Sequence, residues 1–148
     1  MYFPIFIDLS EKKILVVGGG AIASRRVRTL RSFAGQITVQ APEISEEIRG
    51  LAGDCRVTIR EEAFYPEILS GMDLVLAATN DRKLNSRIGE LCREQRIPVN
   101  VCSRKEDCDF FFPSVIQKGD LVIGINASGK NHSLVKRTRQ EMEEFLRK

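Results

Sequence analysis

The sequence predicts an α/β protein: a Rossmann-type parallel sheet followed by a small C-terminal α+β dimerisation segment. An apolar stretch at residues 14–17 leads into three glycines and then directly into a helix. Further apolar, β-branched stretches then alternate with helical patterns along most of the chain. Beyond the last of these alternations, two strands and a single helix remain.

The glycine turn after the first predicted strand carries the most specific signal. Gly18, Gly20 and Ala23 fit the G-x-G-x-x-G/A spacing. In that spacing the first glycine permits a tight turn, the second lets the backbone approach a pyrophosphate, and the third small residue allows close helix packing. We therefore expect a dinucleotide phosphate site at the start of the first helix. A purely structural glycine turn is the alternative, because the bare motif also occurs by chance.

The second predicted strand, residues 36–40, completes a βαβ unit. A ribose-binding acid usually follows the glycines by about 20 residues. Here neutral Gln40 ends the strand and Glu43 follows it. Glu43, or the backbone at Ala41 and Pro42, is therefore the expected ribose contact, and the choice between NAD and NADP stays open.

The same parallel sheet is expected to contain further strands at residues 57–60, 72–79 and 97–101. Ser45 and Asp81 are predicted to cap the helices that precede the first and last of these strands. The apolar stretch at 72–79 ends in Thr79 and polar neighbours, as expected of a central strand whose carboxyl end meets ligand. Asn100 should lie near the same edge of the sheet.

The pattern changes after the fifth strand. Residues 109–116 and 121–126 are predicted as strands around a turn, and a helix from about residue 133 to 146 ends the sequence. These elements are too few for a free-standing domain, so we expect them to pair with a second subunit in a homodimer. The alternative is that they extend the main sheet. The expected division is an NAD-binding Rossmann domain over residues 1–113 and a dimerisation segment over residues 114–148.

Composition and net charge limit the classes of partner that the protein is expected to bind. The 148 residues are 43% hydrophobic, enough for one core, and no apolar stretch reaches the roughly 18 residues of a membrane helix. We therefore expect a cytoplasmic protein with no membrane partner. A net charge of +3 is too small to indicate nucleic acid. The basic side chains are either solvated helix faces or part of a cleft for a polyanionic small molecule.

The four cysteines include no C-x-x-C pair, so reduced thiols are expected. Cys102, Cys108 and the only histidine, His132, are residue types that bind soft metals. Their spacing matches no zinc pattern, and we expect no bound metal.

A set of motifs follows in order at residues 2–9, 16–26, 39–43, 77–81 with Asn85, 98–101, 108–113 and 127–130. Together they resemble the siroheme-synthase N-terminal family over almost the whole sequence. The resemblance implies an interlocked homodimer that oxidises the tetrapyrrole precorrin-2 to sirohydrochlorin with NAD, on the route to siroheme or a corrinoid. The sequence also ends near the point where longer family members continue into a helical domain.

By position, the resemblance adds Ala21, Ile22, Pro42 and Glu43 to Gly18 and Gly20 as cofactor contacts, with Thr79 and Asn100 bordering the cleft between cofactor and substrate. Precorrin-2 carries many carboxylates, so Arg104, Lys105 and Lys130 are expected to bind it. Ser128 is a further candidate through its hydroxyl and neighbouring N–H groups, with a plain turn as the alternative.

The sequence departs from the family pattern at Ser103, where bifunctional members carry an aspartate thought to serve proton removal and metal insertion. Unassisted serine is a poor base. Hydride transfer needs mainly positioning, whereas Fe²⁺ insertion requires removal of pyrrole N–H protons. The substitution therefore puts ferrochelatase activity in more doubt than dehydrogenase activity, and a separate chelatase would then be needed.

Ser103 and His132 are the candidate catalytic residues. His132 is of a type that titrates near neutral pH and serves as acid or base, with a surface helix cap as the alternative. A rival function is an NAD-sensing regulatory dimer without catalysis. A short-chain dehydrogenase is disfavoured, because neither tyrosine begins a Tyr-x-x-x-Lys pair.

Overall fold

The computed structural model describes residues 2–147, which form two compact units. The larger unit is Ile7–Phe110, and the smaller comprises the residues that precede Ile7 together with those from Phe111 onward. The grouping of the N-terminal residues with the C-terminal elements has no counterpart in the sequence patterns. The functional division at residue 113 stays a prediction.

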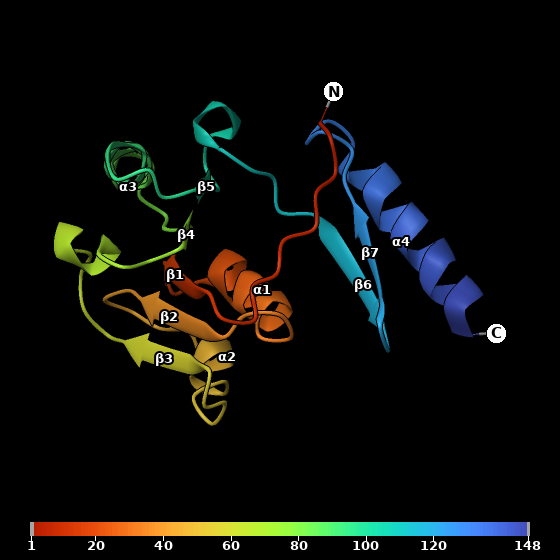
Figure 1. The fold of residues 1–148 in the computed structure, drawn as a ribbon, viewed down its shortest axis with the longest axis horizontal. Helices are drawn as coiled ribbons and strands as arrows, with labels where there is room; N and C mark the ends of the chain where they lie inside the picture. Colours follow the sequence, from red (N-terminus) through yellow and green to blue (C-terminus); the bar gives the residue numbers. More distant parts are fainter. Residues whose placement is uncertain (1, 148) are drawn as a thin grey trace. The chain divides into compact units, whose positions relative to one another are not determined.

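The larger unit is built on a five-stranded sheet in the order β3-β2-β1-β4-β5 (Figure 1). All neighbouring strands run parallel. The strands are β1 (Lys13–Val17), β2 (Gln36–Gln40), β3 (Val57–Arg60), β4 (Leu74–Ala77) and β5 (Val99–Val101). The predicted Rossmann-type sheet is confirmed, and its strand order changes direction between β1 and β4, where such sheets bind ligands.

Helices connect these strands, as the alternating pattern predicts. They are α1 (Ala21–Leu30), α2 (Glu46–Arg49), the short 3₁₀ helix η1 (Pro66–Leu69) and α3 (Arg82–Glu94). A second 3₁₀ helix, η2 (Lys105–Asp107), follows β5. The central strands are buried on both faces, which explains why β4 is entirely apolar. Leu15, Val75 and Val99 from the strands pack with Ile88 of α3 and Leu69 of η1 in one core.

The strand expected at residues 109–116 is wrong in position, because β6 is Ser114–Lys118. Asp109 is held against β5 instead. Its backbone N–H donates to Val99 O and its carboxylate accepts from Val99 N, both at 2.9 Å. These bonds tie Asp109 to β5 and not to the later hairpin.

The smaller unit pairs β6 with β7 (Leu121–Ile125) as an antiparallel hairpin, and α4 (His132–Arg147) contacts both strands. Gly119 turns the hairpin with φ +57°, a conformation that favours glycine. Within the described residues β6 and β7 form a sheet of their own, so they do not extend the main sheet.

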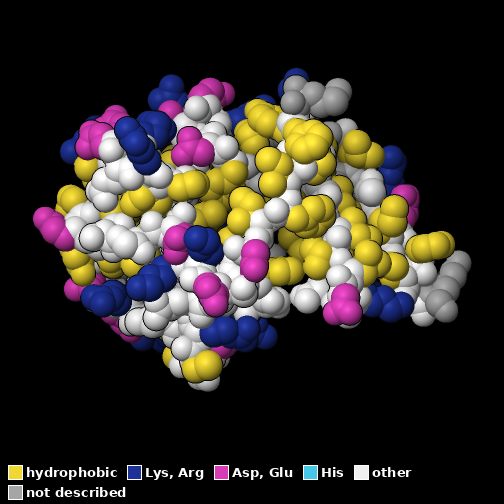
Figure 2. Space-filling model, in the orientation of Figure 1, with side chains coloured by type: hydrophobic (Ala, Val, Ile, Leu, Met, Phe, Trp, Pro, Cys, Tyr) yellow, Lys and Arg dark blue, Asp and Glu magenta, His cyan; other side chains and the backbone are white. Residues whose placement is uncertain are grey.

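Large hydrophobic side chains of the smaller unit are exposed. Figure 2 shows hydrophobic surface over this part of the molecule, and Phe3, Phe6 and Phe145 are 85%, 76% and 70% exposed. Tyr2 packs on Phe111 with ring centroids 4.2 Å apart. Exposed apolar patches of this kind mark interaction surfaces. None of the helices described here is long and apolar enough to cross a membrane.

Candidate dinucleotide site

A cleft of about 490 Å³ lies at the carboxyl ends of β1, β2 and β4. Its walls are the glycine turn after β1, the segment that follows β2, and the turn that follows β4. Gly18, Gly20, Pro42, Glu43 and Thr79, all expected from the sequence, line it. We call it the cofactor cleft.

The glycines of the turn are needed for different structural reasons. Gly18 has φ +134°, and its N–H donates to Gln40 O at 2.9 Å. A Cβ at Gly18 would collide with the carbonyl group of Ala78, and one at Gly19 with that of Glu43. Nothing lies within 4 Å of a Cβ placed at Gly20. Gly20 therefore leaves open space beside the backbone, as a bound pyrophosphate requires.

The start of α1 supplies hydrogen-bond donors to this space. Gly20 is the N-cap residue, no side chain caps the helix, and no acidic residue lies in its first turn. The N–H groups of Ala21 and Ile22 therefore have no intrahelical acceptor and carry the positive end of the helix dipole. This donor set fits a pyrophosphate, so the residues present match a dinucleotide.

The segment after β2 forms the opposite wall. Pro42 and Glu43 are exposed, whereas Gln40 is buried and donates through Nε2 to Ala63 O at 2.8 Å. Glu43 and Asp81 are the only charged residues that line the cleft in the described chain. Both are acidic, which disfavours a ligand with an additional phosphate at this place.

The ends of β4 and β5 position the next candidates. Thr79 lines the cleft and hydrogen-bonds to buried Asn85 of α3. Asn100 is 5% exposed, lies outside the cleft lining, and donates through Nδ2 to Phe110 O at 2.8 Å. Sequence reasoning did not assign Asn85 a site role. The available signal was a polar residue among the inward-facing positions of an amphipathic helix.

The candidate substrate and catalytic residues lie in both units. In the larger unit, Ser103, Arg104 and Lys105 follow β5 and are exposed, and Arg104 pairs with Asp107 at 3.7 Å. In the smaller unit, Ser128 and Lys130 lie in the turn after β7, where Ser128 has φ +56°.

His132 is the exposed first residue of α4. The capping contact at this end belongs to Asn131, whose Oδ1 accepts from Leu134 N at 2.9 Å. His132 therefore occupies the first turn and is not the residue that makes the cap.

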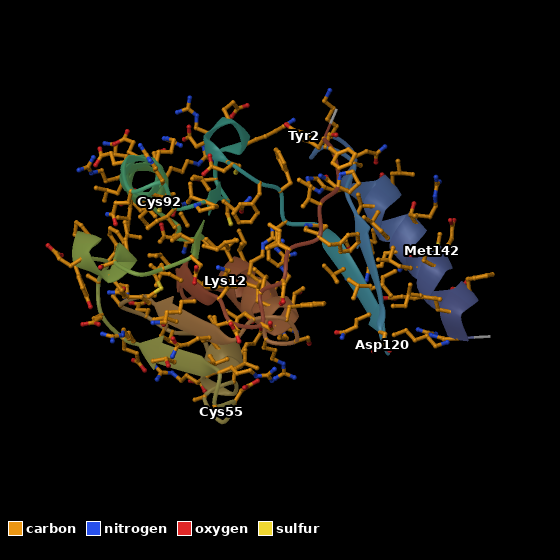
Figure 3. The ribbon with its side chains drawn as sticks, in the orientation of Figure 1. Tyr2, Lys12, Cys55, Cys92, Asp120 and Met142 are labelled. Atoms are coloured by element: carbon orange, nitrogen blue, oxygen red, sulfur yellow. The ribbon has the colours of Figure 1, made fainter. Side chains whose placement is uncertain are left out.

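The four cysteines lie in the larger unit, where one is exposed and three are buried or partly buried. Figure 3 shows Cys55 in the loop between α2 and β3 and Cys92 on α3. Burial raises the pKa of the Cys92 thiol to about 12, and it raises the pKa values of Cys102 and Cys108 as well. These thiols are protonated at neutral pH. Among the described residues no group of three or more His, Cys, Asp or Glu is placed to hold a metal ion.

The parallel sheet, the glycine turn, the open start of α1 and the cleft at the change in strand order define a dinucleotide-binding Rossmann domain. A family model described as putative NAD(P)-binding matches residues 5–114. The chain belongs to this NAD(P)-binding family.

Known relatives agree with that assignment. The chain is 38% identical over 144 residues to the probable multifunctional siroheme biosynthesis protein HemA of Ruminiclostridium josui, covering 97% of this chain and 28% of the relative. It is 36% identical over 144 residues to the siroheme synthase of Psychrobacter sp. (strain PRwf-1), covering 97% and 30%. The chain thus spans less than a third of these curated relatives.

A solved structure is similar over nearly the whole chain. It is that of SirC, precorrin-2 dehydrogenase, with a TM-score of 0.77 and 26% sequence identity. The match covers 97% of this chain and 70% of that one.

Proposed function

We propose that this chain is an NAD-dependent precorrin-2 dehydrogenase of siroheme or corrinoid biosynthesis. The observation that carries the proposal is the cofactor cleft, set in a fold similar to SirC over 97% of the chain. The siroheme-biosynthesis relatives indicate the same tetrapyrrole substrate class.

The cofactor contacts are proposed from the cleft. The N–H groups of Ala21 and Ile22 and the open space at Gly20 hold the pyrophosphate, and Pro42 and Glu43 border the adenosine. NAD supplies the acceptor for a hydride when it is bound. The acidic lining favours NAD over NADP, because Glu43 and Asp81 repel a further phosphate.

The reaction removes two electrons and two protons from precorrin-2. One hydride leaves for NAD⁺ and one proton is released, which gives sirohydrochlorin, NADH and H⁺. Arg104, Lys105, Ser128 and Lys130 are proposed to bind the substrate carboxylates, since cationic and hydroxyl groups are the natural donors to them. Ser103 and His132 are the proposed catalytic residues.

The enzyme is proposed to act as a homodimer, with the exposed hydrophobic side chains of the smaller unit in the interface. A separate chelatase is proposed to insert the metal, because Ser103 offers no carboxylate to accept pyrrole protons.

The test is an anaerobic assay of the purified chain with precorrin-2 and NAD⁺, with optical spectra of both tetrapyrrole and NADH. The proposal expects sirohydrochlorin and NADH to appear together and neither to form without NAD⁺. NAD⁺ binding without any oxidation would favour an NAD-sensing regulatory dimer and overturn the enzyme proposal.

A further inference from the structure

Asn85 is the buried polar residue that contacts two candidate positions of the site at once. It lies in the first turns of α3, the helix that connects β4 to β5, and its side chain is fully buried. It reaches Thr79 after β4 and Ser103 after β5. A buried amide between two strand ends has to find partners for every polar atom.

The hydrogen bonds of Asn85 use the whole amide group. Oδ1 accepts from Thr79 N at 3.0 Å and lies 2.7 Å from Thr79 Oγ1. Nδ2 donates to Thr79 O at 3.0 Å and to Ser103 Oγ at 3.2 Å. Both amide protons are thereby donated, and Oδ1 accepts from the Thr79 backbone. The single hydroxyl proton of Thr79 has two acceptors within reach, Asn85 Oδ1 and Asp81 O, the latter at 3.0 Å. The amide has one possible orientation, because the backbone N–H of Thr79 requires the oxygen and its carbonyl requires the nitrogen.

We propose that Asn85 is a positioning residue that fixes the Thr79 wall of the cofactor cleft and the Ser103 hydroxyl in one geometry. This inference rests on the proposed dehydrogenase function and deepens it. Both backbone polar groups of Thr79 are bound to Asn85, so the wall cannot shift without breaking buried hydrogen bonds.

The same contact determines what Ser103 does. Its oxygen accepts a hydrogen bond from Asn85, which leaves its own O–H free to point outward as a donor. Ser103 is exposed, so this donor faces solvent or ligand. Ser103, proposed above as a catalytic residue, therefore has the role of a hydrogen-bond donor to the substrate and not that of a general base.

The Asn85→Asp variant separates positioning from packing. It keeps the size and the acceptor toward Thr79 N but replaces both donors by an acceptor. The Ser103 hydroxyl then turns inward to donate to the new carboxylate and is lost to the substrate. We expect kcat to fall by about tenfold, which corresponds to the loss of about one hydrogen bond. We expect Ser103→Ala to cause a similar fall alone and no additional fall in the Asn85→Asp background.

The effect of Asn85 on NAD⁺ binding is measured without turnover. Calorimetric titration with NAD⁺ should show weaker binding to Asn85→Asp than to the unmodified chain, because Thr79 O faces a carboxylate and the wall shifts. Ser86→Ala is the matched control, since Ser86 also joins α3 to the loop after β5, through Asp107 at 3.5 Å, without touching Thr79 or Ser103. It should leave NAD⁺ affinity and kcat unchanged.

Failure of the proposed function and failure of the positioning role are distinguishable. If the unmodified chain binds no NAD⁺ and oxidises no precorrin-2, the proposed function fails. The network is then still tested by the nitrogen-15 NMR signal of the Asn85 amide, which Ser103→Ala should shift. If the unmodified chain is active while Asn85→Asp and the double variant have independent effects, or only unfold more easily, the positioning role is overturned.

Discussion

At the scale of single residues, neighbouring glycines of one turn have different roles, some in folding and one in ligand binding. Gly18 and Gly19 are enclosed by carbonyl groups of the turns after β4 and β2, so any side chain there disturbs the fold. Gly20 has open space around it, so a side chain there would disturb only what binds. The two kinds of glycine cannot be distinguished from the motif spacing alone, because the neighbours come from distant parts of the sequence.

The Gly20→Val variant tests the phosphate site directly. Gly20 has extended backbone angles, φ −93° and ψ −163°, which valine adopts readily. We expect the free energy of unfolding to change by less than about 0.5 kcal/mol. The affinity for NAD⁺ should fall by about tenfold or more, because the added methyl groups occupy the pyrophosphate position and block the N–H donors.

Calorimetry with NAD⁺ and thermal unfolding measure both quantities. Gly53→Val is the matched control, since a Cβ at Gly53 also meets nothing within 4 Å and lies outside the cleft lining. Unchanged NAD⁺ affinity in Gly20→Val would show that the cofactor binds elsewhere.

At the scale of elements, the carboxylate of Asp73 joins the starts of two adjacent strands. It lies just before β4, accepts from Lys13 N at 2.9 Å, and pairs with Lys12 Nζ at 3.1 Å. The bond from the Lys13 backbone, followed by that from the Lys12 side chain, holds the pKa of Asp73 below its usual value. The link therefore requires the ionised carboxylate.

The sign of the pH dependence follows from this lowered pKa. The contribution of Asp73 is fully present above the unfolded pKa, about 3.9, and is lost as the pH falls through the folded pKa. We expect Asp73→Asn to be less stable than the unmodified chain at pH 7 and the difference to shrink below about pH 4. Denaturant titrations at several pH values measure it, and a pH-independent difference would contradict this role.

Local patterns predicted the first βαβ unit because its signals are contiguous: an apolar strand, glycines and a helix. They misplaced β6 because Asp109 binds β5 through contacts that no local pattern contains. The cleft residues Gly18, Gly20 and Thr79 were predictable from strand ends. The role of Asn85 was not, since it depends on two turns that only the folded sheet brings together.

At the scale of the whole molecule, the exposed aromatic residues of the smaller unit predict self-association. Phe3, Phe6 and Phe145 expose apolar surface that a monomer would leave in water. We expect light scattering at micromolar concentration to give twice the mass of the 16.7 kDa chain. A mass of a single chain would contradict the proposed homodimer.

For the molecule as a whole, we expect precorrin-2 oxidation without metal insertion. Ser103 replaces a carboxylate and Arg104 adds a positive charge beside it, which repels Fe²⁺. We expect the purified chain to insert Fe²⁺ into sirohydrochlorin no faster than the uncatalysed rate. Spectra recorded with and without protein measure this rate. Robust insertion by the unmodified chain would contradict the prediction and indicate Asp107, Asp109 or His132 as the proton acceptor.

The central claim is that precorrin-2 is oxidised by NAD⁺ bound at the glycine turn. A single-turnover reaction under anaerobic conditions tests it most directly, with the unmodified chain, Gly20→Val and Gly53→Val compared at one limiting NAD⁺ concentration. The account predicts one NADH per sirohydrochlorin for the unmodified chain and Gly53→Val, and almost no product for folded Gly20→Val. Equal product from all three chains, or no NADH from any of them, would contradict it.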